Sequence, residues 1–107
     1  MPSGEEDSAR SFYCGALGMT ELEKPAELRA RGGAWFASGE VQLHLGVDSP
    51  FVPAKRAHPA LRCADLATLR ERLEAFGSKI VAGGVFDDGL MHCYVEDPFG
   101  NRIELIG

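Results

Sequence analysis

The run DPFGNRIEL at residues 97–105 is the stretch that decides the fold of this chain. Pro98 restricts φ and Gly100 can adopt a positive φ, so the first five residues of the run predict a tight turn. A closing strand is predicted over 103–106, and on it Glu104 has apolar neighbours. A buried carboxylate is costly unless it is paired, hydrogen-bonded or bound to a metal. Glu104 is therefore a candidate functional residue, and a solvated glutamate on the sheet exterior is the alternative.

The pattern of this closing strand occurs a second time, earlier in the chain. Residues 41–43 (VQL) match residues 103–105 (IEL), and residues 16–18 end one predicted helix much as residues 75–77 end another. Each predicted helix is followed by a strand, a loop and a two-strand hairpin. A repeat of this size predicts two similar lobes packed side by side.

The first half predicts one helix and three strands. In chain order, the predicted elements are a helix over 9–16, a strand over 19–23, a loop with a possible helical turn over 24–31, and strands over 33–37 and 41–45. Asp7 or Ser8 is expected to cap the helix, and Gly18 to end it. The alternation in the last strand puts Gln42 and His44 on one face.

The second half repeats this order after a proline-containing linker. Its predicted elements are a strand over 58–63, a helix from the Asp65 cap to Gly77, a strand over 79–82, a turn-rich loop over 83–89, and strands over 90–95 and 103–106. The helix should bury one apolar face, formed by Leu66, Leu69, Leu73 and Phe76. We expect a single domain over 1–107, with module 1 at about 1–47, a linker at 48–57 and module 2 at about 58–107.

Composition excludes several classes of function. Hydrophobic residues make up 45% of the chain, charged residues 25%, and the formal net charge is −5, which gives no attraction for nucleic acid or an anionic membrane surface. The three cysteines lack C-x-x-C spacing, so neither a disulfide framework nor a zinc knuckle is expected. The polar start MPSGEEDSAR is not expected to be a signal peptide. A cytoplasmic protein is the simplest expectation.

Four features of the sequence point to one family: the repeat, the helix followed by Leu17-Gly18-Met19, the strand-like run HPALR at 58–62, and the closing run. Together they resemble the vicinal-oxygen-chelate superfamily, which comprises glyoxalases, bleomycin resistance proteins and dioxygenases. The resemblance covers essentially the whole chain and implies an α+β fold. In it, two paired βαβββ modules form a curved-sheet cleft that often holds a divalent metal. Residues 1–7 are too polar to supply the opening strand of the first module. The exposed sheet edge that results favours a homodimer.

The resemblance also implies a set of metal ligands. Glu104 matches the usual final ligand and is the candidate catalytic carboxylate, and His58 stands where many members place a histidine. We expect these two side chains to converge within a few ångströms. Gln42, by the repeat, or His44, by its chemistry, is the candidate further ligand. These donors suit Zn²⁺, Mn²⁺, Fe²⁺, Ni²⁺ or Co²⁺ without choosing among them. The alternatives are a surface position for His58 and a polar lining or substrate-contacting role for the other two.

Five further side chains are candidates for substrate contact. Tyr94 and His92 share a face of the strand before the closing turn, where similar proteins place a substrate-facing tyrosine. Trp35 and Phe36 alternate, so one should line the cleft while the other packs on a helix. Arg62 would hold an anionic group. Each could instead be a packing or a solvated residue.

These features favour a divalent-metal-dependent enzyme acting on a small oxygen-bearing substrate, as a lyase, isomerase or dioxygenase. No second glutamate stands in a clear position to act as the general base of an isomerase. The main alternative is a metal-free protein that binds a drug or another small molecule, as bleomycin resistance proteins do. A weaker alternative is a purely structural or interaction domain.

Overall fold

The computed structural model describes all residues, 1–107, and has an α+β fold. It divides into two compact units, Met1–Val52 and Pro53–Gly107, and the boundary falls within the predicted linker. No helix combines the length and the apolar composition needed to cross a membrane.

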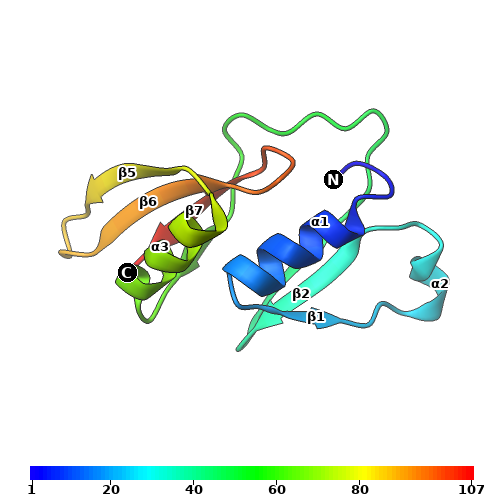
Figure 1. The fold of residues 1–107 in the computed structure, drawn as a ribbon, viewed down its shortest axis with the longest axis horizontal. Helices are drawn as coiled ribbons and strands as arrows, with labels where there is room; N and C mark the ends of the chain where they lie inside the picture. Colours follow the sequence, from blue (N-terminus) through cyan, green and yellow to red (C-terminus); the bar gives the residue numbers. More distant parts are fainter. The chain divides into compact units, whose positions relative to one another are not determined.

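The second unit is a complete βαβββ module (Figure 1). Its elements are β4 (Ala60–Arg62), α3 (Leu66–Phe76), β5 (Ile80–Val85), β6 (Met91–Glu96) and β7 (Arg102–Ile106). The sheet order is β4-β7-β6-β5. β7 lies parallel to β4 and antiparallel to β6, so the first and last strands of the module lie side by side.

The turn between β6 and β7 forms because of Asp97. This carboxylate is 5% exposed, and its Oδ1 accepts the backbone N–H groups of Phe99 and Asn101 at 2.9 and 2.8 Å. The Asn101 amide nitrogen donates to the other carboxylate oxygen at 2.8 Å. Gly100 has φ +86, as the sequence predicts. The turn therefore uses its own side chains to satisfy its backbone, which fixes where β7 begins.

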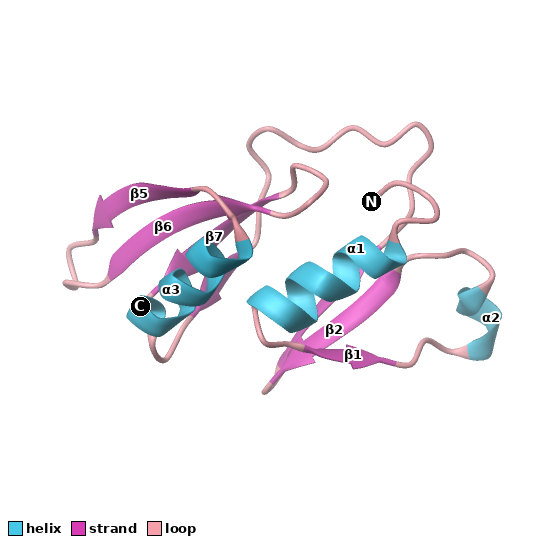
Figure 2. Ribbon diagram, viewed as in Figure 1, coloured by secondary structure: helices cyan, strands magenta, loops and turns pink.

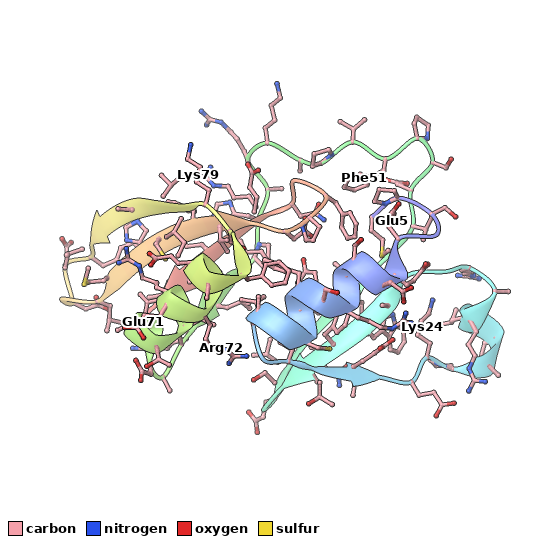
Figure 3. All side chains as sticks on the ribbon, viewed as in Figure 1. Glu5, Lys24, Phe51, Glu71, Arg72 and Lys79 are labelled. Carbon is pink, nitrogen blue, oxygen red and sulfur yellow. The ribbon has the colours of Figure 1, made fainter.

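Helix α3 has the predicted ends. The Asp65 carboxylate accepts the Thr68 backbone N–H at 3.1 Å, and Gly77 is left-handed with φ 99. The predicted apolar face is wrong at Phe76, which is 46% exposed because it is the last helical residue. Glu71 and Arg72 are also exposed on this helix (Figure 3). The core of this unit consists of Leu66, Leu73, Cys93, Val95, Ile103 and Leu105.

Strand β5 extends further than the sequence predicts. Gly83, Gly84 and Val85 were expected in a loop, but they continue the strand. The pairing with β6 shifts between Ala82 and Gly84, where a bulge absorbs one residue. Gly83 and Gly84, which suggest a turn in the sequence, instead accommodate this bulge and the His92 ring that lies against it.

The first unit repeats the module without its opening strand (Figure 2). Its elements are α1 (Glu6–Arg10), the π-helical segment η1 (Ser11–Ala16), β1 (Thr20–Leu22), α2 (Ala26–Arg29), β2 (Ala34–Ser38) and β3 (Val41–Leu45). The sheet order is β1-β2-β3. In the β2–β3 hairpin Gln42 pairs with Ala37, and in the β6–β7 hairpin Glu104 pairs with Tyr94. The repeat-related residues Gln42 and Glu104 thus each lie on the last strand of their unit, opposite a residue of the preceding strand.

Helix α1 begins earlier than the sequence predicts, at Glu6. The expected caps Asp7 and Ser8 lie inside it, and the residue at the cap position, Glu5, makes no capping bond. The start is held from a distance instead, because the Glu6 carboxylate accepts the backbone N–H of Gly33 at 2.9 Å. That bond also lowers the pKa of Glu6. The helix therefore starts where it can contact the chain that leads into β2.

The core of the first unit is aromatic. Tyr13 stacks on Phe36 with ring centroids 5.0 Å apart and meets Phe12 edge to face. The outer strand β3 pairs with β2 alone, and the chain start lies at its far end, since the amino group of Met1 donates to the Gly46 carbonyl at 2.7 Å. The expectation that a second copy of the chain covers this edge stays a prediction.

Candidate functional site

The site face of the second unit is the side of its sheet that carries Glu104 and Tyr94, away from the core. Tyr94 and Glu104 are cross-strand partners on β6 and β7. His58 reaches this face from just before β4, because Ala60 is the partner of Glu104 and the Pro59 carbonyl accepts the Glu104 N–H at 3.0 Å. Nε2 of His58 lies 3.0 Å from Oε2 of Glu104. The predicted approach of these two side chains is thus present.

The protonation of His58 follows from its second contact. Its Nδ1 lies 2.6 Å from the backbone carbonyl of Arg56, which can only accept a hydrogen bond, so Nδ1 carries a proton. In the neutral ring, the Nε2 lone pair then faces the Glu104 carboxylate. Two acceptors at this distance are unfavourable unless a proton or a cation lies between them. A neutral imidazole with this lone pair and an adjacent carboxylate oxygen are donor types that metal ions bind.

The donor set fits a metal ion as two adjacent ligands. Metal bonds of about 2.1 Å at about a right angle place two ligand atoms about 3 Å apart, which is the separation of Nε2 and Oε2. The side chains of His58 and Glu104 are 23% and 12% exposed. No group of three or more histidine, cysteine, aspartate or glutamate side chains within residues 1–107 could hold a metal. Two donors by themselves leave the coordination of such an ion incomplete.

Tyr94 stands at the centre of the site face and contacts three other side chains. The rings of His58 and His92 each meet it edge to face, with centroids 5.7 Å away. The guanidinium carbon of Arg102 lies 4.0 Å from its ring centroid. Arg102 was not among the sequence candidates, although strand alternation places it on the same face as Glu104.

His92 is held between an aromatic ring and a glycine. Phe86 stacks on it with centroids 4.0 Å apart and planes at 16°. On the bulge of β5, a Cβ built on Gly83 would overlap the imidazole ring. The Nδ1 atom is buried and has no hydrogen-bond partner. Sequence analysis did not single out Phe86, which lies directly after β5 in the part of the predicted loop that the structure keeps.

We expect Gly83→Ala to lower the free energy of unfolding by about 1–3 kcal/mol, because the new methyl group must displace the His92 ring. Urea denaturation measures the loss, and NMR shifts of the ring report its movement. Gly15→Ala is the control, since nothing lies within 4 Å of its added Cβ. Equal stabilities of the two variants would show that the ring is not held by close contact with Gly83.

The first unit brings three of the predicted residues together on one face of its own sheet. Trp35 and His44 stack with centroids 3.7 Å apart and planes at 4°. His44 Nε2 lies 3.0 Å from the side-chain oxygen of Gln42. Phe36 lies on the opposite face of β2 and is 0% exposed. It is therefore a core residue and not a candidate for substrate contact. Strand alternation had left open which of the two aromatic residues faces outward.

Arg62 and the cysteines complete the set of predicted positions. Arg62 is exposed and pairs in register with Ile106, two residues beyond Glu104 on the same face. Burial raises the pKa of the Cys63 and Cys93 thiols, which disfavours a nucleophilic thiolate.

The chain is similar to proteins of one superfamily over nearly its whole length. A family model described as the Glyoxalase/Bleomycin resistance protein/Dioxygenase superfamily matches residues 2–105. A glyoxalase family protein from Bacillus anthracis is 42% identical, with a TM-score of 0.93, over 99% of this chain and 86% of that chain. No curated protein sequence matches.

Two more distant structures share the fold. A lactoylglutathione lyase from Agrobacterium tumefaciens is 20% identical, with a TM-score of 0.70, over 99% of this chain and 87% of that chain. An antibiotic-binding protein from Streptomyces sp. CB03234 is 24% identical, with a TM-score of 0.73, over 98% of this chain and 88% of that chain. At these identities the likeness concerns the fold alone.

Proposed function

Because the chain belongs to the Glyoxalase/Bleomycin resistance protein/Dioxygenase superfamily, we propose that it is a divalent-metal-dependent enzyme acting on a small oxygen-bearing substrate, with His58 and Glu104 as metal ligands. The observation that carries this proposal is the His58–Glu104 pair, with Nε2 and Oε2 3.0 Å apart. The Arg56 carbonyl supports it, since a hydrogen bond from Nδ1–H leaves Nε2 free to bind a metal.

The chain's own residues would position the reacting groups. A bound divalent ion supplies Lewis-acid chemistry at the substrate oxygens. The parallel pairing of β4 with β7 holds His58 beside Glu104, so the two donors need little rearrangement to bind the ion. Tyr94 and His92 form an aromatic surface next to them, against which a substrate can lie.

A second candidate is a metal-free protein that binds a small molecule. The aromatic surface favours it: Phe86 is 40% exposed and stacks on His92, which in turn contacts Tyr94. Exposed aromatic rings bind flat apolar ligands without any metal. The antibiotic-binding relative supports this candidate at the level of the fold, as the lactoylglutathione lyase supports the first.

Metal analysis separates the two candidates. The purified protein is incubated in turn with Zn²⁺, Mn²⁺, Fe²⁺, Ni²⁺ and Co²⁺, freed of unbound metal, and measured for metal per chain. We expect close to one ion per chain with at least one of these metals, and a loss of that ion in His58→Ala. A content far below one ion with all five metals would contradict metal dependence and leave the binding protein as the function.

A further inference from the structure

Arg102 is a half-buried cation on the site face without an anionic partner. It makes none of the four ion pairs in residues 1–107, and no group of the chain accepts a hydrogen bond from it. Its cross-strand neighbour Glu96 is exposed and does not pair with it. A guanidinium group has five N–H donors and no acceptor, so its donors remain available to a bound molecule.

The guanidinium group is nevertheless held in place. It lies over the ring of Tyr94, with 4.0 Å between the guanidinium carbon and the ring centroid. Stacking on an aromatic ring restricts the long side chain while leaving the edge of the guanidinium plane open. Less conformational entropy is then lost when an anion binds, which favours recognition of a carboxylate by two parallel hydrogen bonds.

The same tyrosine ring also contacts His58, whose Nε2 is next to Glu104. The anion-binding edge of Arg102 and the proposed metal ligands are thus neighbours of one side chain.

We propose that Arg102 makes the site face selective for anions, and that the ligand is a small carboxylate. Arg102 binds the carboxylate through its N–H donors. The inference rests on the proposed function in taking this face as the ligand site. It assigns the substrate class, which the metal ligands by themselves do not.

The test compares mandelate with mandelamide, which have nearly the same shape and differ in charge. Isothermal titration calorimetry measures their binding to the metal-free protein and to the protein loaded with Zn²⁺. We expect mandelate to bind the unmodified protein about tenfold to a hundredfold more tightly than mandelamide, as for a hydrogen-bonded charge. Arg102→Gln should lower the affinity for mandelate by a similar factor and leave that for mandelamide unchanged.

Two variants control for charge and for folding. Arg72→Gln removes the same charge from the exposed side of α3, away from the site face, and should keep the preference for mandelate. Arg102→Lys keeps the charge but loses the planar group, and should give an intermediate affinity. Circular dichroism establishes that each variant is folded.

The proposal is overturned if the unmodified protein binds both probes equally or neither, or if Arg102→Gln keeps the preference for mandelate. Its failure is distinct from that of the proposed function. Absence of metal binding together with a charge preference that depends on Arg102 would refute metal dependence and support the anion site. Metal binding through His58 and Glu104 without any charge preference would support metal dependence and refute the anion site.

Discussion

Replacing Glu104 with glutamine is expected to lower the affinity for the divalent metal by more than about a hundredfold, because even the loss of a group that only orients a ligand costs tenfold to a hundredfold. The change removes one of the two donors that the structure places 3.0 Å apart, and an amide is a far weaker ligand than a carboxylate. Titration of the metal-free protein with Zn²⁺, followed by competition with a chelator, measures the affinity.

The same variant should keep its fold. Since Nδ1 of His58 donates to the Arg56 carbonyl, Nε2 can accept a hydrogen bond from the new side-chain amide. Glu71→Gln is the matched control, because it removes the same charge from an exposed position on α3. Equal metal affinities of the two variants would exclude Glu104 as a ligand. A folded Glu104→Gln protein with weak metal binding would support the assignment.

The second large effect concerns stability. Phe36→Ala should lower the free energy of unfolding by about 3–5 kcal/mol, because the ring is 0% exposed and its removal leaves a cavity beside Tyr13. Such a loss is a large share of the total stability of about 5–15 kcal/mol that is common for small domains. Urea denaturation followed by far-UV circular dichroism measures it.

The neighbouring residue supplies the comparison. Trp35 lies on the other face of β2, half-buried, and stacks on His44. Trp35→Ala loses an aromatic pair worth about 0.5–1.5 kcal/mol in addition to its partial burial, so it should destabilise clearly less than Phe36→Ala. A larger loss for Trp35→Ala would mean that the two faces of β2 have been assigned the wrong way round.

Local chemistry explains where sequence analysis was accurate. The cap at Asp65, the left-handed Gly77 and the turn at 97–101 are correct, because each is determined by side chains within a few residues. Predictions failed where distant contacts override local signals. The start of α1 is fixed by the bond from Gly33 to Glu6, and the glycines of β5 form a bulge against His92.

The sequence by itself determined the order of the elements, the repeat and the closing strand that carries Glu104, because turns, caps and alternation are properties of neighbouring residues. Only the tertiary structure decided which face each strand buries and which side chains meet. His58 and Glu104 are 46 residues apart, and Arg102 meets Tyr94 across a strand pair. Alternation assigns residues to two faces, but strand register and the position of the core decide which face is open and which residues share it.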